Sequence, residues 1–165
     1  MNEESLRWDL PLGSLPRVSQ AQRVEQAAGR LVERWWLPRL WTLHLYLYEA
    51  ELIVNGVTLQ IRPGYADLIP PDTDIEYHYR GPAPHLFVHF RLAPSTGKDT
   101  VSVPAMQDLG RDFPTFYAAA EDISRWYARR PRRAGVRLWE ILWQLADRAA
   151  AATTDPDART IVHRV

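Results

Sequence analysis

Residues 54–79 read VNGVTLQIRPGYADLIPPDTDIEYHY, a succession of short apolar segments and sharp turn signals. Asn55-Gly56 is typical of the tight turn of a β-hairpin, because both residues tolerate a positive φ angle. Pro63-Gly64 marks a second corner, and Pro70-Pro71-Asp72 marks a third. Each segment between two corners has the length of an ordinary β-strand. The pattern predicts consecutive antiparallel strands joined by tight turns.

The same strand pattern continues on both sides of this stretch. Leu43, Leu45 and Leu47 alternate with polar or aromatic residues, and residues 85–92, HLFVHFRL, form a further apolar segment. Short strands with turn chemistry between them are typical of an all-β sandwich or barrel. No helical pattern separates these strands, so we do not expect a parallel α/β sheet.

After Pro104 the apolar period changes from two to three or four residues. Phe116 and Ile123 lie on one face of the first helix that this period predicts. Pro131 is expected to break that helix, because proline has no backbone N–H to donate. Trp139 and Trp143 then define the apolar face of a second helix. The two helices together predict a helical hairpin.

The chain divides into four predicted parts. Residues 1–20 form an N-terminal arm, 21–104 the β-barrel, 105–152 the helical hairpin and 153–165 a polar linker. The apolar residues of the arm could dock on the barrel, and a frayed terminus is the alternative.

Composition limits the function classes that fit this chain. Its 165 residues suffice for one domain with a real core and a small appendage. The absence of cysteine excludes disulfides, thiolate metal sites and a cysteine nucleophile. Twenty basic and twenty acidic residues balance, so no net charge attracts nucleic acid. No apolar run has the ~20 residues of a membrane span, and the acidic N-terminus is unlike a signal peptide, so we expect a cytoplasmic protein.

The order and spacing of residues 54–79, HLFVHFRL and the helical hairpin resemble the N-terminal cupin domain of AraC-type transcription regulators. The resemblance covers residues 20–165. It implies a mainly β fold with α, a cupin-like jelly-roll antiparallel β-barrel followed by a two-helix hairpin. It also implies a small-molecule effector such as a sugar, a homodimer, and DNA binding through a C-terminal domain that this sequence lacks.

The resemblance further implies a set of ligand-binding residues. In a sugar-responsive member of the family, an arginine, a tyrosine, a histidine and an aromatic residue line the pocket. By position these are similar to Arg34, Tyr77, His85 and Phe87. The family's usual aspartate after the Pro-Gly corner is Tyr65 here, so the resemblance leaves the identity of the effector open.

The residues themselves suggest two more ligand contacts. His85 and His89 are four apart and share one face of a strand, so both could hydrogen-bond a ligand or serve structural roles. Trp35, Trp36 and Trp41 could stack on a sugar or an aromatic effector, and packing in the barrel or the hairpin is the alternative. Trp36 is the one assigned to the ligand site, and Trp36 or Trp41 is the more readily buried. Arg34 presents forked donors that suit hydroxyls or a carboxylate. A solvated surface position is the alternative for this arginine.

The histidines and acidic residues do not have the spacing of a catalytic or metal site. Metallo-cupins carry two histidines one residue apart, and His44 has no such neighbour. We therefore predict no metal, no cofactor and no catalytic residue. The acidic residues around the Pro-Pro turn are assigned to turn stabilisation; they are Asp67, Asp72, Asp74 and Glu76. The alternatives are a small metal-dependent cupin enzyme (dioxygenase or isomerase) and a filled barrel that only dimerises.

The helical hairpin carries more large apolar residues than one layer over a barrel requires. A dimer interface is the economical explanation for such an excess. The predicted interface residues are Trp126, Trp139, Leu142 and Trp143. The expected partners are thus a small effector, a second copy of the chain and, only through the missing domain, DNA.

Overall fold

The computed structural model of the chain describes residues 6–26, 30–95 and 97–154. Its strands are β1 (Arg7–Pro11), β2 (Arg17–Gln26), β3 (Val32–Trp35), β4 (Trp41–Tyr46), β5 (Ala50–Val54), β6 (Val57–Ile61), β7 (Tyr65–Ile69), β8 (Ile75–Tyr79), β9 (Ala83–Arg91), β10 (Thr100–Pro104) and β11 (Met106–Asp108). Its helices are α1 (Phe113–Trp126) and α2 (Pro131–Thr154), and short 3-10 turns cover Gly97–Asp99 and Gly110–Asp112.

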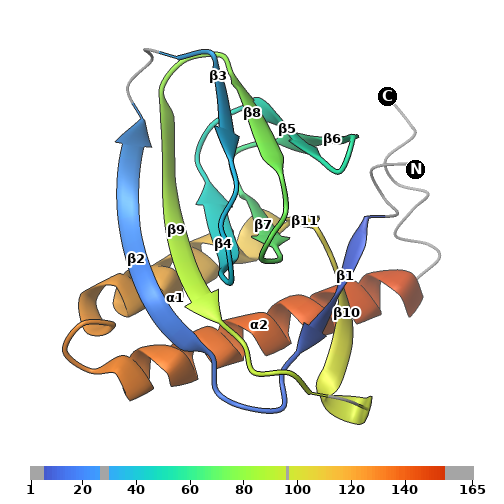
Figure 1. Ribbon diagram of the computed structural model, residues 1–165, viewed down its shortest axis with the longest axis vertical. Helices are drawn as coiled ribbons and strands as arrows, with labels where there is room; N and C mark the ends of the chain where they lie inside the picture. Colours follow the sequence, from blue (N-terminus) through green and yellow to red (C-terminus); the bar gives the residue numbers. More distant parts are fainter. Residues whose placement is uncertain (1–5, 27–29, 96, 155–165) are drawn as a thin grey trace.

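The strands build two main antiparallel sheets that form a barrel (Figure 1). One sheet has five strands in the order β11-β7-β4-β9-β2, and the other has four in the order β3-β8-β5-β6. Asn55 and Gly56 join β5 to β6 with φ angles of 50° and 76°, as the predicted tight turn requires. The predicted fold class, a cupin-like antiparallel β-barrel followed by a helical hairpin, is confirmed.

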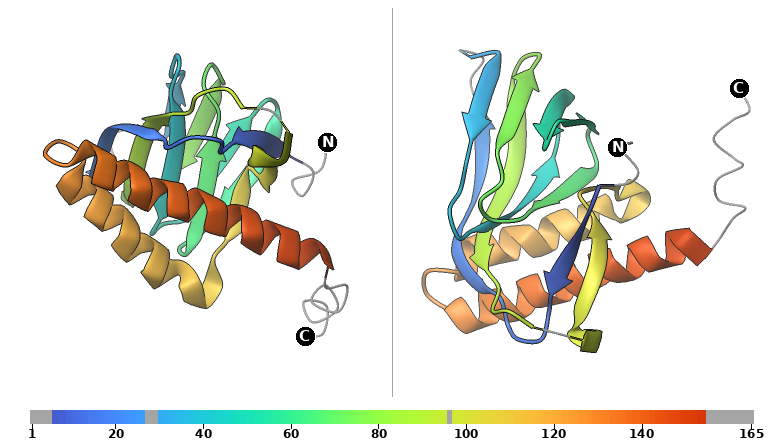
Figure 2. Two further views of the ribbon diagram at one scale, coloured as in Figure 1. Left: turned by 90° about the horizontal axis from the view of Figure 1, so that it is seen from below. Right: turned by 45° about the vertical axis from the view of Figure 1, so that its right-hand side comes forward.

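The outer face of the five-stranded sheet packs against both helices. Figure 2 shows α1 and α2 side by side on one side of the barrel, and both contact β2. Alternate residues of β9, namely Leu86, Val88 and Phe90, are buried in this core with Ile123 of α1 and Leu142 of α2. Burial of each such side chain contributes about 1.5–3 kcal/mol. The helices are therefore an integral part of the barrel core.

A second apolar core lies inside the barrel, around β5 and β6. Its members include tyrosine and aliphatic side chains from both sheets, among them Tyr46, Tyr48, Leu52, Val54, Leu59, Ile61, Tyr77 and Tyr79. The protein's own side chains therefore fill this part of the barrel interior.

The N-terminal segment is docked on the barrel. Residues 7–11 pair with residues 100–104 as β1 and β10, and the Trp8 indole Nε1 donates to the Leu68 carbonyl at 2.7 Å. Residues 17–26 form a ten-residue strand paired with β9. The boundary predicted at residue 20 therefore falls inside β2.

The helical hairpin is longer than predicted. Residues 127–130 separate the helices, and Pro131 is the first residue of α2, where its missing N–H removes no helical hydrogen bond. The helix ends at Thr154, so the first residues of the predicted linker are helical. The rest of that linker, residues 155–165, lies outside the described residues. Among the helices described, none is long and apolar enough to cross a membrane.

The predicted dimer residues pack within their own chain. Leu142 is 0% exposed, and Trp126, Trp139 and Trp143 pack half-buried against the core under the sheet. The Trp139 indole also donates to the Leu12 carbonyl at 3.0 Å. The apolar excess that suggested a dimer seam is therefore used to hold the hairpin and the N-terminal segment on the barrel. Dimerisation itself stays a prediction.

Candidate ligand-binding site

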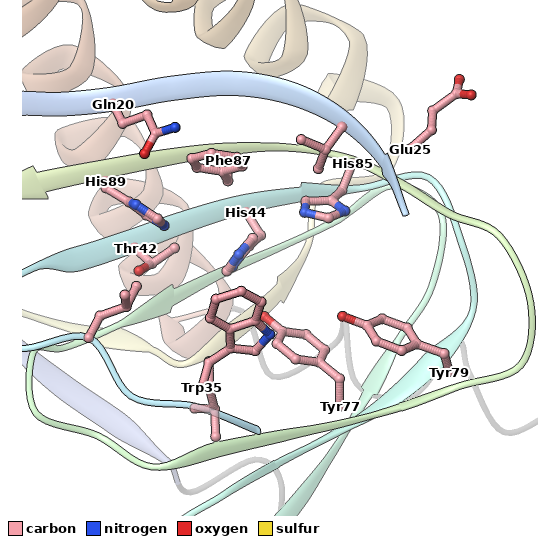
Figure 3. Close-up of a pocket in the computed structure, with 13 residues that line it drawn as sticks. Gln20, Glu25, Trp35, Thr42, His44, Tyr77, Tyr79, His85, Phe87 and His89 are labelled. Atoms are coloured by element: carbon pink, nitrogen blue, oxygen red, sulfur yellow. The ribbon is translucent and has the colours of Figure 1, made fainter. Parts of the chain in front are cut away.

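A cavity of about 540 Å³ lies between the two sheets, beside the filled core. This volume is typical of small-molecule sites. Side chains from β2, β3, β4, β8 and β9 surround it (Figure 3). They are Gln20, Val24, Glu25, Trp35, Leu37, Thr42, His44, Ile75, Tyr77, Tyr79, His85, Phe87 and His89. The cavity thus combines aromatic walls with several hydrogen-bonding groups.

Four of the predicted ligand-binding residues line this cavity. They are Tyr77 on β8 and His85, Phe87 and His89 on β9. The β9 residues alternate with those that pack under the helices, because successive side chains of a strand point to opposite faces. The rings of Phe87 and His89 also contact each other, with centroids 4.6 Å apart. Contact of these residues with a ligand stays a prediction.

Arg34 and Trp36 do not line the cavity, contrary to the prediction. The Arg34 side chain is 81% exposed, and its Nε donates to the Glu76 carboxylate at 2.6 Å. This pair follows from the register of β3 and β8, which places Arg34 opposite Glu76. Trp36 lies just after β3 and is 54% exposed, whereas its neighbour Trp35 lines the cavity. We expected burial of Trp36 or Trp41, and Trp41 is the buried residue.

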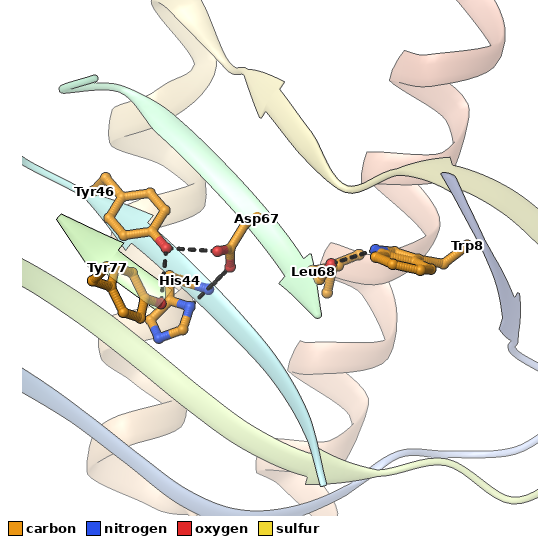
Figure 4. Close-up of polar contacts among 6 residues, drawn as sticks. All are labelled: Trp8, His44, Tyr46, Asp67, Leu68 and Tyr77. Carbon is orange, nitrogen blue, oxygen red and sulfur yellow. Dashed lines mark hydrogen bonds and ion pairs between the residues drawn. The ribbon is translucent and has the colours of Figure 1, made fainter. Parts of the chain in front are cut away.

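A buried carboxylate, Asp67, holds His44, which lines the cavity (Figure 4). One of its oxygens accepts from the Nδ1 of His44 at 2.8 Å and from the His44 backbone N–H at 3.1 Å. Its other oxygen accepts from the Tyr46 hydroxyl at 2.5 Å, and the Tyr46 and Tyr77 hydroxyls lie 3.3 Å apart. Asp67 therefore belongs to a buried network. The prediction that it stabilises a turn is wrong.

This network fixes how His44 faces the cavity. A carboxylate only accepts hydrogen bonds, so the proton on Nδ1 of His44 points to Asp67. The Nε2 edge of the ring is then the edge available to a molecule in the cavity. The imidazole also packs edge-on against His85, with ring centroids 5.5 Å apart.

The two β9 histidines are neutral at physiological pH. Burial and, to a smaller extent, the nearby His44 lower the pKa of His85 to about 4. Burial and His44 likewise lower the pKa of His89 to about 4. The Nδ1 of His85 donates to the Ala83 carbonyl at 2.8 Å, which leaves Nε2 as an acceptor. Two uncharged imidazoles thus line the same wall.

The tyrosines of the cavity keep their hydroxyl protons. Burial raises the pKa of Tyr77 well above its ordinary value, and the Asp67 carboxylate raises it further. Burial and the Glu33 carboxylate raise the pKa of Tyr79 in the same way. Both phenols are therefore hydrogen-bond donors at any physiological pH. Their rings stack in parallel, with centroids 5.5 Å apart and an interplanar angle of 1°.

No cluster of three or more histidine or acidic side chains in the described residues could hold a metal ion. His44 and His85 each have Nδ1 anchored to an oxygen of the protein. This is an arrangement that also orients metal-binding histidines.

Several cavity residues were missed by the sequence predictions. Thr42 and His44 are the polar residues that alternate with the buried leucines of β4, and this alternation was a usable signal once the strand was expected to close a barrel. Gln20 was assigned to the arm. Trp35 was a stacking candidate, but Trp36 was assigned to the site in its place, and a one-residue difference in register moves a side chain to the other face.

Comparisons with known proteins give fold similarity at low identity. No protein-family model matches the chain, and no curated protein matches it. YhaK from Escherichia coli is 17% identical over 64% of this chain and 51% of that one, with a TM-score of 0.44. A predicted oxalate decarboxylase from Thermotoga maritima is 15% identical over 46% and 69%, with a TM-score of 0.41. The Cupin_2 domain of an XRE family transcriptional regulator from Enterobacter cloacae is 13% identical over 45% and 81%, with a TM-score of 0.36.

Proposed function

We propose that this chain is the effector-sensing and dimerisation part of a cytoplasmic AraC-type transcription regulator. A small molecule binds in the cavity, and its binding controls DNA binding by a C-terminal domain. The observation that carries the proposal is that the cavity and the helices share the same strands. His85, Phe87 and His89 face the cavity, while Leu86 and Val88 between them contact the helical core.

This shared strand supplies a physical route from ligand to helices. A ligand that presses on one face of β9 shifts side chains that pack on the other face, because protein cores are close-packed and transmit strain. The ligand controls the regulator only if it binds two arrangements of the protein with different affinities. The helical hairpin is the element whose position would differ between them.

The cavity offers hydrogen bonds to the polar groups of a ligand as well as apolar contact. Gln20, Thr42 and the Tyr77 hydroxyl offer hydrogen bonds of the kind that a sugar or another polar effector uses. Trp35 and Phe87 offer flat apolar walls for a ring. A sugar is the effector class that the family resemblance favours.

A thermal-shift screen over sugars, small acids, amines and aromatic compounds tests the proposal. We expect at least one class to raise the melting temperature, since a ligand that binds only the folded state stabilises it. Absence of any stabilising compound would favour a purely structural module. Stoichiometric iron or manganese after mild purification would favour the metal-dependent enzyme instead.

Calorimetric titration of the best compound then locates the site. Tyr77→Phe removes only one hydroxyl from the cavity, and we expect it to weaken binding by up to about tenfold. Arg34→Ala is the control, because this exposed side chain lies outside the cavity. If both variants bind the compound with the affinity of the wild type, the compound does not contact the Tyr77 hydroxyl in this cavity.

The dimerisation part of the proposal has a separate test. Light scattering of the purified chain should give the mass of two 19.1 kDa subunits. A mass of one subunit at all concentrations tested would remove dimerisation from the proposal and leave ligand binding intact.

A further inference from the structure

The charge around the cavity comes from carboxylates. Glu33 on β3 is half-buried, and its carboxylate accepts from the Trp35 indole Nε1 at 3.2 Å and from the Tyr79 hydroxyl at 3.3 Å. Both of these aromatic side chains line the cavity. The carboxylate is therefore held between two cavity-lining rings.

Asp67 supplies a second negative charge next to the cavity-lining residue His44. Its side chain is 0% exposed and lies against His44, which lines the cavity. The two carboxylates act on the lining groups: Asp67 raises the pKa of Tyr77, and Glu33 raises the pKa of Tyr79, each in addition to the effect of burial. Their electrostatic field thus extends to the cavity walls.

No lysine or arginine is among the described cavity-lining residues, and the lining carboxylate Glu25 lies 3.5 Å from the Arg23 guanidinium. Arg34, the nearest candidate by sequence, is paired with Glu76 on the exposed side of β3 and β8. His85 and His89 do not supply positive charge either, because a pKa of about 4 leaves roughly one molecule in a thousand protonated at pH 7. An anionic ligand would meet no lysine or arginine among the described residues of these walls.

The aromatic walls favour a positive charge for an independent reason. The faces of tryptophan and tyrosine rings carry negative electrostatic potential and attract cations, most strongly where water is excluded. Trp35, Tyr77 and Tyr79 contribute such rings to the cavity (Figure 3). Two of them, Trp35 and Tyr79, hydrogen-bond Glu33. Aromatic rings around a carboxylate form the kind of site that binds ammonium groups.

We propose that the ligand of this cavity is a small organic cation, with a protonated or quaternary nitrogen attached to an apolar or aromatic body. The nitrogen lies among Trp35, Tyr79 and the Glu33 carboxylate, and the body lies along Phe87 and Ile75. This inference rests on the proposed function, since it names the class of ligand for the same cavity.

Three probes of matched shape and different charge test the inference by calorimetry on the purified chain. They are benzyltrimethylammonium, benzyl alcohol and benzoate. We expect the ammonium ion to bind at least about tenfold more tightly than the alcohol, and benzoate to bind most weakly. Benzoate or the alcohol binding as tightly as the ammonium ion would overturn the inference.

The variant Glu33→Gln separates charge from shape. The glutamine oxygen can still accept from Trp35, so the wall is kept while the charge is removed. We expect the preference for ammonium over alcohol to fall about tenfold. Glu49→Gln is the control, because Glu49 carries the same charge on an exposed loop and pairs with Arg80. An unchanged preference in Glu33→Gln, with a melting temperature equal to that of the wild type, contradicts the proposed nitrogen site.

The outcomes distinguish this inference from the proposed function. If a sugar or another neutral compound binds and the ammonium probe does not, the cationic ligand is wrong and the sensing cavity stands. If neither the probes nor any compound of the screen binds, both proposals fail.

Discussion

The two faces of the five-stranded sheet use the same strands for opposite purposes. On the outer face Leu86, Val88 and Phe90 meet the helices and are almost fully buried among apolar side chains. On the inner face His85 and Phe87 border a cavity of about 540 Å³. The outer face holds the fold together, whereas the inner face keeps polar groups available. Because successive side chains of β9 point to opposite faces, one set of residues stabilises the fold and the other set borders the cavity.

The buried Asp67 is where the inner face also contributes to stability. Asp67→Ala removes the acceptor of the His44 and Tyr46 hydrogen bonds and leaves both groups buried without it. We expect a loss of about 3–5 kcal/mol in the free energy of unfolding, measured by urea denaturation. Asp74→Ala, at an exposed position of the same acidic group, should change stability by at most about 0.5 kcal/mol. Equal losses in the free energy of unfolding for the two substitutions would show that the Asp67 network does not stabilise the fold.

The outer face is tested by Leu142 of α2. Leu142→Ala opens a cavity under the sheet at a residue that is 0% exposed, and we expect it to cost about 3 kcal/mol. Val136→Ala is the matched control on the same helix, because Val136 is 53% exposed. A cost below about 1 kcal/mol for Leu142→Ala would contradict the role of this residue in the core under the sheet.

The neutral histidines of the inner face predict a pH dependence of stability. Their pKa is about 4 in the folded chain, below the ordinary value of 6.5, so the unfolded chain binds protons at higher pH. Stability should therefore fall as the pH is lowered from 6.5 to 4, by at most about 1.4 kcal/mol per pH unit for each histidine. The double variant His85→Asn, His89→Asn should flatten this slope in denaturation curves. The same slope in both proteins would contradict the assignment to these histidines.

The parts of the fold that were predictable have strong local signals. The Asn55-Gly56 turn and the alternating leucines of β4 determine backbone conformation from neighbouring residues alone. The sequence analysis did not predict strand β2. Its exposed edge position allows polar residues on both faces, as in RVSQAQRVEQ, so it lacks an alternating apolar pattern.

The candidate site was only partly predictable because its contacts are distant in sequence. Asp67 and His44 are separated by 23 positions, and only the pairing of β4 with β7 brings them together. A charged residue inside the apolar segment Ala66–Ile69 is nevertheless a signal of a buried partner, since lone buried charges are very costly. The choice between Trp35 and Trp36 needed the register of β3, which no local signal supplies.

The most direct test compares two neighbouring residues of β9 with opposite faces. The best compound of the screen is titrated by calorimetry into Phe87→Ala and Val88→Ala. We predict that Phe87→Ala lowers affinity by about tenfold with little loss of stability, and that Val88→Ala loses about 2–3 kcal/mol of stability but keeps its affinity. Loss of affinity in Val88→Ala alone, or unchanged affinity in both variants, would contradict the binding role of the inner face.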